Sequence, residues 1–157
     1  MKTNCSSNTS PEDNGCTKSG IFTYSIKVMF CDIDGNGHVN NKHYNSYCDE
    51  AVMRMFDHSG IDLSGLAKSG IGPVIYKAEY EYHSDLKYGD TVKISSTVSF
   101  PKKTRAIFEH TLVNETTGAV VCKAQSVGLW IDMKTKKTHR FSDEILEKML
   151  TPTASFV

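Results

Sequence analysis

A two-residue alternation of apolar and polar side chains, interrupted by one long helical stretch, most constrains what this chain can fold into. In residues 22–30, FTYSIKVMF, every second side chain from Phe22 onward is apolar, so one face of an extended strand can be buried while the other meets water. Further strand patterns cover residues 74–82, 92–100, 106–112, 119–131 and a short stretch near 137–141. The intervening breaks KYGD, FPKK and NETTG are short enough for antiparallel hairpins.

The long helical stretch begins at residue 40 or 41, because either Asn40 or Asn41 can cap a helix there. Apolar side chains then recur at intervals of three and four residues along one stripe. These are Tyr44, Tyr47, Cys48, Ala51 and Met55. Glu50 can pair with Arg54 one turn on, and Gly60 is a typical helix stop.

The segments after this helix complete the outline of the fold. The glycines of residues 61–73 indicate a loop ahead of the second strand. A short C-terminal helix is expected after Ser142, which can cap it, with Asp143 and Glu144 near its positive end. The order strand, long helix, then at least four antiparallel strands predicts an α+β fold, with the helix packed on one curved sheet of five to six strands.

One helix cannot cover both faces of such a sheet, so we expect self-association as a homodimer or homotetramer. The chain of 157 residues is long enough for one domain with its own core. We place this domain at residues 21–150. Residues 1–20, rich in Ser, Thr and Asn, are expected to be a flexible N-terminal tail, and residues 151–157 a C-terminal tail.

Composition excludes several classes of partner. Eighteen basic residues balance eighteen acidic ones, so the basic footprint of a nucleic-acid-binding protein is missing. No apolar run approaches a membrane span and no signal peptide is evident, so we expect a cytoplasmic protein without membrane contact. The cysteines lack CxxC spacing, which argues against a disulfide framework and a zinc site. They are Cys5, Cys16, Cys31, Cys48 and Cys122.

The densest group of chemically useful side chains lies in DIDGNGHVNN, residues 32–41, between the first strand and the long helix. The N–H groups of a first helical turn lack acceptors and carry the positive end of the helix dipole, so they can polarise a carbonyl oxygen. A carboxylate beside them can attack that carbonyl or activate a water against it. The sequence therefore predicts a catalytic site at this junction.

The segment VMFCDIDGNGHVNNKHYNSYCDEAVMR resembles the first strand, loop and helix of the 4-hydroxybenzoyl-CoA thioesterase family and of the fatty acyl-ACP thioesterases, both hotdog-fold enzymes. The resemblance is strong over residues 24–56 and is mainly one of pattern elsewhere, as in EYHSDLKYGD, where Asp85 replaces a Pro that is common in the family. It implies a hotdog thioesterase that hydrolyses an acyl-CoA or acyl-ACP to free acid and thiol. Coenzyme A or acyl carrier protein would arrive as part of the substrate, so no separate cofactor and no metal are expected.

The resemblance also implies roles for individual residues. Asp34 would be the catalytic carboxylate, acting as nucleophile or as base towards water, and Asn41 stands where the helix N-terminal amide polarises the thioester carbonyl. The loop of the acyl-ACP branch reads D-x-N-x-H, so Asn36 and His38 would orient water or substrate. That branch also uses a later Glu, which we do not assign in this sequence. Asp32 is expected to be structural, holding loop amides.

Other residues are candidates for substrate contact. Tyr44 and Tyr47 lie on the buried stripe and are expected in the core or in the pocket wall. Lys102, Lys103 and Arg105, in a turn between two strands, either meet the phosphates of coenzyme A or form a solvated hairpin tip. The apolar helix stripe favours a fatty or aromatic acyl group over a charged one.

Two other chemistries are compatible with parts of the same loop. Asp32, Asp34 and Asn36 occupy positions 1, 3 and 5 of a calcium-binding EF-hand loop, but His43 replaces its bidentate Glu and the preceding segment alternates like a strand, which disfavours calcium. A nucleophilic Cys31 or Cys48 with a histidine base is also conceivable. Small thiols at such positions are more commonly buried and inert.

A hotdog domain can host more than one function. One alternative is an enoyl-thioester hydratase, which uses an Asp and a His on this architecture, although the NN after His38 is more like the thioesterases. The second is a catalytically silent acyl-binding hotdog protein. The carboxylate, amide and imidazole retained in one loop argue against the silent form.

Overall fold

The computed structural model describes residues 18–151, so residues 1–17 and 152–157 of the two predicted tails, with Cys5 and Cys16, lie outside the described residues. The strands are β1 (Phe22–Lys27), β2 (Ile71–Tyr82), β3 (Thr91–Lys102), β4 (Arg105–Asn114), β5 (Val120–Asp132) and β6 (Thr138–His139). The helices are α1 (Asn41–His58), α2 (Leu63–Lys68) and α3 (Asp143–Leu150), with a short 3-10 helix at Phe30–Asp32.

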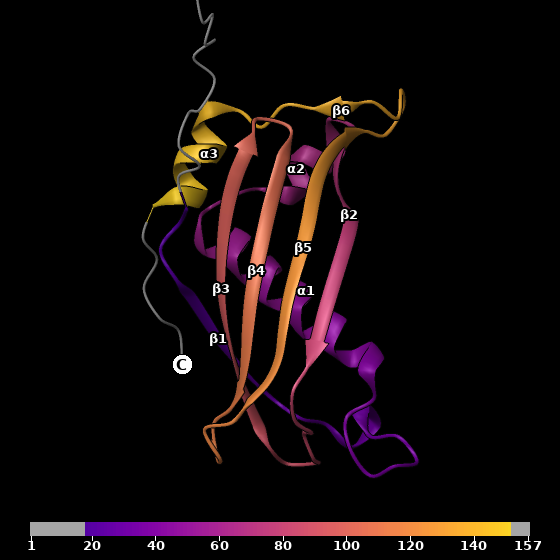
Figure 1. Cartoon of the computed structure of the whole chain (residues 1–157). Helices are drawn as coiled ribbons and strands as arrows, with labels where there is room; N and C mark the ends of the chain where they lie inside the picture. Colours follow the sequence, from indigo (N-terminus) through magenta and orange to yellow (C-terminus); the bar gives the residue numbers. More distant parts are fainter. Residues whose placement is uncertain (1–17, 152–157) are drawn as a thin grey trace, which may run out of the picture.

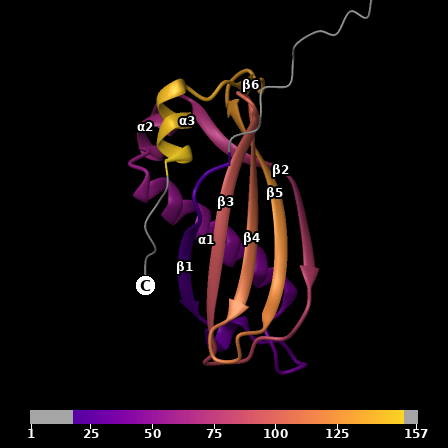
Figure 2. The same cartoon turned by 60° about the vertical axis from the view of Figure 1, so that its left-hand side comes forward.

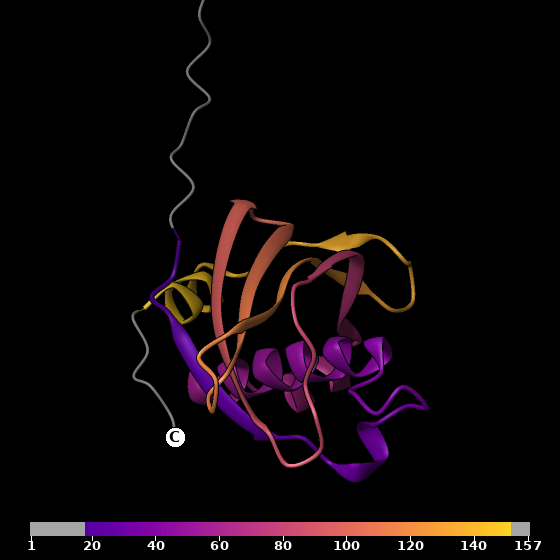
Figure 3. The ribbon, with the colours of Figure 1, turned by 60° about the horizontal axis from the view of Figure 1, so that its bottom comes forward.

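The strands form one antiparallel sheet in the order β1-β3-β4-β5-β2, and β6 pairs with β5. The sheet curves around α1, which runs diagonally across its inner face (Figures 1 and 3). Helices α2 and α3 both lie towards the upper end of the sheet in Figures 1 and 2. This is the predicted α+β hotdog arrangement, a long helix on a curved sheet.

The stripe predicted for the long helix is its buried face. Tyr44, Tyr47, Cys48, Ala51 and Met55 are all buried, and Val52 and Phe56 join them. The first half of α1 packs on Ile94 and Leu112, and the second half on Phe108 and Trp130. The core therefore runs the whole length of α1 and holds both ends of the helix against the sheet.

The residues predicted to begin and end the helices are confirmed. Asn40 is the cap of α1, and its side chain accepts a hydrogen bond from the Lys42 N–H at 3.1 Å. Gly60 follows the helix with a φ of 67°, a conformation that glycine adopts without strain. Ser142 caps α3 by accepting from the Ile145 N–H. The Asn40 cap places the start of α1 at the end of the loop of residues 32–41, where the candidate site was predicted.

Two local predictions were wrong. The first strand ends at Lys27, because the Asp32 carboxylate accepts from the Met29 N–H at 2.9 Å and bends the chain into the 3-10 helix, which leaves Phe30 exposed. The expected loop of residues 61–73 contains α2, which Asp62 caps by accepting from the Gly65 N–H at 2.9 Å. In both places a single carboxylate outweighs the intrinsic preference of its neighbours.

The described part of the expected N-terminal tail pairs with the sheet. The Ser19 N–H donates to the Val98 carbonyl at 2.8 Å, and the Val98 N–H donates to Ser19 Oγ at 2.9 Å. None of the described helices combines the length and the apolar character that a membrane crossing requires.

Candidate active site

A cleft of about 380 Å³ opens where the loop before α1 meets the connection between β2 and β3, at the lower end of the sheet in Figure 1. The two segments are joined by the Val39 N–H, which donates to the Leu86 carbonyl at 2.8 Å. The cleft is lined by Asp34, His38, Val39, Asn41, Tyr44, Tyr82, His83, Ser84 and Asp85. Four of the predicted site residues, Asp34, His38, Asn41 and Tyr44, therefore share one cavity.

Asp34 is held by a tight turn. Its Oδ1 accepts from the Asn36 N–H at 2.8 Å, and its own N–H donates to the His38 carbonyl at 3.0 Å. Gly37 completes the turn with a φ of 80°, which favours glycine. Within residues 18–151, Oδ2 of Asp34 makes no hydrogen bond, so the turn orients the carboxylate and leaves one oxygen available to a ligand or a water.

The start of α1 supplies a hydrogen-bond donor to the same cleft. Asn40 satisfies the Lys42 N–H with its side chain and the His43 N–H with its carbonyl, at 3.1 and 3.0 Å. The N–H of Asn41 has no acceptor in the part of the chain that the structure describes. Because this amide lies at the positive end of an 18-residue helix, it can donate to a carbonyl oxygen on which negative charge develops.

Asp32 is engaged inside the protein. Its Oδ2 accepts from the Tyr47 hydroxyl at 2.7 Å and from the Met29 N–H at 2.9 Å, and His43 Nδ1 lies 3.4 Å from Oδ1. Burial by itself would raise the pKa of Asp32, but the hydrogen bonds from Tyr47 and Met29 and the nearby His43 bring the pKa below its usual value. The predicted structural role of Asp32 fits these contacts.

The two predicted tyrosines have different positions. Tyr44 lines the cleft, 5.1 Å from Tyr82 between ring centroids. Burial, with smaller effects of Cys122, Asp85 and Tyr82, raises the pKa of Tyr44 to about 12, so its hydroxyl stays protonated at neutral pH. Tyr47 is buried and donates to Asp32. It acts on the site through the loop and is not part of the cleft wall.

The structure does not bring every predicted site residue to the cleft. The Asn36 side chain is exposed and does not line the cavity. Lys102 and Arg105 pair with each other at the β3–β4 turn, at the upper end of the sheet in Figures 1 and 2. Because β3 rises about 3.3 Å per residue, this turn lies roughly 35 Å from the Thr91 end of β3 beside the cleft. Within one chain these two residues do not share a site with Asp34.

Sequence reasoning missed the second wall of the cleft. Tyr82, His83, Ser84 and Asp85 come from the end of β2 and the connection that follows it. The signal in the sequence was Asp85 itself, a carboxylate at a position where the resembled family commonly has Pro. The cleft thus contains two carboxylates, Asp34 and Asp85, on opposite segments.

The competing chemistries find little support in the geometry. Among residues 18–151 no group of three or more His, Cys, Asp or Glu side chains could hold a metal ion, and protein donors already occupy Asp32. Burial raises the pKa of the Cys48 thiol, which makes it a poor nucleophile. Cys31 is exposed, in contrast to the expected burial, and does not line the cleft.

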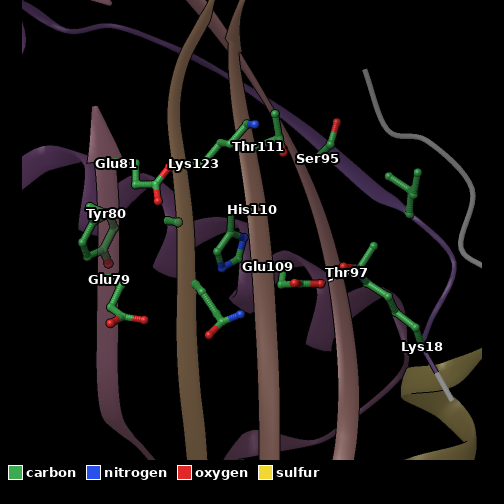
Figure 4. Close-up of a pocket in the computed structure, with 13 residues that line it drawn as sticks. Lys18, Glu79, Tyr80, Glu81, Ser95, Thr97, Glu109, His110, Thr111 and Lys123 are labelled. Atoms are coloured by element: carbon green, nitrogen blue, oxygen red, sulfur yellow. Dashed lines mark hydrogen bonds and ion pairs between the residues drawn. The ribbon is translucent and has the colours of Figure 1, made fainter. Parts of the chain in front are cut away.

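A larger hollow of about 970 Å³ lies on the outer face of the sheet (Figure 4). Its wall is polar, with Glu109 paired to Lys18. Beneath it His110 Nδ1 lies 2.8 Å from Ser96 Oγ, and burial lowers the pKa of His110 to about 4. Ser96 is fully buried and His110 is nearly so, which favours a structural role for this Ser–His pair.

A curved antiparallel sheet around one long helix, with a carboxylate-bearing cleft at the start of that helix, defines a hotdog-fold protein. The family model described as the thioesterase-like superfamily matches residues 28–149. The chain belongs to this superfamily.

Individual relatives agree with this assignment. The chain is 26% identical over 116 residues to the chloroplastic acyl-acyl carrier protein thioesterase ATL3 of Arabidopsis thaliana, covering 74% of this chain but only 61% of the relative. It is 25% identical over 109 residues to the acyl-CoA thioester hydrolase YbgC of Escherichia coli, with 65% and 81% covered.

A solved structure shows the same fold. The 1,4-dihydroxy-2-naphthoyl-CoA thioesterase from Synechocystis superposes with a TM-score of 0.79 at 18% identity, covering 83% of this chain and 96% of that one.

Proposed function

We propose that the protein is an acyl thioester hydrolase and that Asp34 is its catalytic carboxylate. The observation that carries this proposal is the meeting of Asp34, His38 and Asn41 in one cleft. Among residues 18–151, one oxygen of Asp34 and the N–H of Asn41 have no hydrogen-bond partner. The superfamily and the two thioesterase relatives support the same chemistry.

The geometry suits attack on a carbonyl held at the start of α1. The Asn41 N–H donates to the thioester oxygen, and Asp34 takes a proton from the water that attacks the carbonyl carbon. The C–S bond then breaks, the acid leaves, and the thiolate takes up the proton from Asp34. In the other route an oxygen of Asp34 attacks the carbonyl carbon and the C–S bond breaks, which releases the thiolate and leaves an anhydride between Asp34 and the acyl group. Water then hydrolyses the anhydride to the free acid and the Asp34 carboxylate, and the proton released by water goes to the thiolate. His38 orients the water or the substrate in both routes.

The carrier of the acyl group is coenzyme A or acyl carrier protein, as in the named activities of the two relatives. Either carrier is part of the substrate, so water is the only other reactant and the proposal includes no cofactor or metal. We place the reaction in the cytoplasm.

We also propose that the chain assembles as a homodimer or homotetramer. Strand β2 is at the edge of the sheet, and its Ile75, Tyr76 and Tyr82 side chains are 50%, 68% and 50% exposed. This edge is unpaired within residues 18–151, and an unpaired edge with exposed apolar side chains favours pairing with another strand. If two β2 strands pair antiparallel about a two-fold axis, opposite ends of the two sheets lie side by side. The turn with Lys102 and Arg105 then approaches the other copy's cleft, where it can meet carrier phosphates.

Free-thiol release from a panel of acyl-CoA and acyl-ACP substrates tests the function. Wild type is expected to release thiol, and Asp34→Asn and Asp34→Ala to lose at least about 100-fold in kcat, the range for a general base. Asp57→Asn, which changes an exposed carboxylate on the same α1, is the matched control and should keep the wild-type rate. Full activity in folded Asp34 variants would show that another group does the chemistry.

The same assay separates the alternatives. Binding of acyl thioesters without any thiol release would favour the silent acyl-binding protein. Loss of enoyl absorbance on addition of an enoyl-CoA, without thiol release, would favour the hydratase. Both outcomes would overturn thioester hydrolysis.

A further inference from the structure

An apolar cavity of about 280 Å³ lies between the second half of α1, the first half of β2 and α3. Its wall includes Met53, Ile75 and Trp130, which is the only tryptophan of the chain. Among the described residues that line the cavity, Asp49 alone is charged. A cavity of this composition suits an alkyl chain.

The cavity and the cleft share the same two walls. On α1 the cleft begins at Asn41 and the cavity at Asp49, and on β2 the cleft meets Tyr82 while the cavity meets Ile75. At 1.5 Å of rise per residue, Asp49 lies about 12 Å beyond Asn41 along the helix. An acyl group whose carbonyl is held at the Asn41 N–H can therefore extend between α1 and β2 towards the cavity.

A chain of hydrogen bonds lies between the two spaces. The Tyr80 hydroxyl on β2 donates to Asn45 Oδ1 on α1 at 2.6 Å, and Asn45 Nδ2 donates to Asp49 Oδ2 at 2.8 Å. The Tyr80 ring stacks on that of Tyr82 in the cleft wall, with 6.3 Å between centroids and 13° between planes. We call these three residues, Tyr80, Asn45 and Asp49, the Tyr80 bridge.

Both hydrogen bonds of the Tyr80 bridge lie at the protein surface, where Asn45 and Asp49 are exposed and Tyr80 is half-buried. Burial raises the pKa of Tyr80, so its hydroxyl remains a donor at neutral pH. Burial also raises the pKa of Asp49, against the hydrogen bond from Asn45 that lowers it. Along the helix, Asn45 lies about 6 Å beyond Asn41. The bridge therefore stands close to the cleft and ahead of the apolar cavity.

We propose that the Tyr80 bridge is a length filter for the acyl group. This inference rests on the proposed thioester hydrolysis and names the feature of the substrate that the protein selects. A short acyl group fits ahead of the bridge and leaves it intact. A long alkyl chain must break the Tyr80 to Asn45 hydrogen bond before it enters the cavity beside Trp130.

Binding of S-alkyl pantetheine thioethers tests the filter without hydrolysis. Pantetheine is common to coenzyme A and acyl carrier protein, and a thioether cannot be hydrolysed. Calorimetry gives the Kd of the butyl and dodecyl compounds, and Trp130 emission reports occupancy of the cavity. We expect the dodecyl compound to change the emission and the butyl compound to bind without changing it.

Tyr80→Phe removes the bridging hydroxyl and keeps the ring. It should tighten the dodecyl Kd roughly fivefold, the factor that corresponds to one neutral hydrogen bond, and leave the butyl Kd unchanged. Asn45→Ala, which breaks the bridge from the helix side, should act in the same direction. Tyr88→Phe removes a hydroxyl from an exposed tyrosine outside both spaces and should have no effect on either Kd.

Three results would overturn the filter. They are an unchanged ratio of the two Kd values in Tyr80→Phe, equal changes of Trp130 emission with both compounds, and no change of emission with the dodecyl compound. Thiol release by wild type from butyryl and dodecanoyl thioesters is measured in parallel. If wild type releases no thiol, the hydrolase proposal is wrong. The binding measurements test the length filter independently of that result.

Discussion

Asp32 and Asp34 are separated by one residue, yet their surroundings indicate different roles. Asp32 is buried and accepts hydrogen bonds from Tyr47 and Met29, so both of its oxygens are engaged in holding the loop. Asp34 accepts one turn hydrogen bond and faces the cleft with its other oxygen. A carboxylate that is to bind water or substrate must retain a free oxygen, and of these two residues Asp34 meets that condition.

The buried His110 makes stability depend on pH. Burial lowers its pKa from 6.5 to about 4 in the folded protein, so between these values the unfolded chain binds a proton that the folded chain does not. Unfolding is therefore favoured as pH falls through this window. From neutral pH to about pH 5 we expect a loss of about 2 kcal/mol in the free energy of unfolding from this group.

Urea unfolding of wild type and His110→Asn at about pH 7 and pH 5 measures this contribution. Asn retains a hydrogen-bond partner for Ser96 but does not titrate, so the variant should lose correspondingly less stability on acidification. Identical pH dependence in the two proteins would exclude His110 as the source.

At the scale of elements, the first turn of α1 contributes both to the stability of the fold and to the candidate active site. The Asn40 cap satisfies the N–H groups of Lys42 and His43, whereas that of Asn41 has no partner in the described part of the chain. The cap therefore fixes the direction in which the free amide points. The core packing of Tyr44 and Tyr47 on the sheet holds this first turn in place.

Asn40→Ala should lower the free energy of unfolding by about 1 kcal/mol, the usual contribution of a helix cap, and should also lower thiol release because the first turn frays. Ser142→Ala removes the cap of α3, away from the cleft, and should cost similar stability without changing the rate of thiol release. Urea unfolding and the thiol assay provide the two measurements. Equal rates of thiol release in the two variants would show that the Asn40 cap does not affect catalysis.

At the scale of the whole molecule, the exposed β2 edge predicts association. Tyr76 is 68% exposed on this strand, at the point where the β2–β5 register shifts, and does not line the cleft or the apolar cavity. A lysine on an edge strand opposes pairing with another chain. Tyr76→Lys should therefore shift the protein towards monomer.

Sedimentation velocity of wild type, Tyr76→Lys and the control Tyr88→Lys checks this expectation. Wild type and the control should sediment as a dimer or tetramer. A monomeric wild type, or an unchanged assembly in Tyr76→Lys, would contradict pairing through β2.

The local sequence determined which segments become strands and helices, because alternation and helical periodicity record which face of each element is buried. A cap at Asn40 or Asn41, the buried stripe of α1 and a candidate site in the loop of residues 32–41 were all predicted from residues close together in the sequence. The 3-10 turn at Asp32 and helix α2 did not, because hydrogen bonds from single carboxylates decided them.

Only the tertiary structure determined which residues line the cleft. The strand order β1-β3-β4-β5-β2 brings Asp85 opposite Asp34, and it sends Lys102 and Arg105 to the far end of the sheet. Tyr47 and Tyr44 share one helical stripe, yet one contacts Asp32 and the other lines the cleft. Local patterns specify which face of an element is buried, whereas the neighbours that cover that face are set by pairing between strands distant in the sequence.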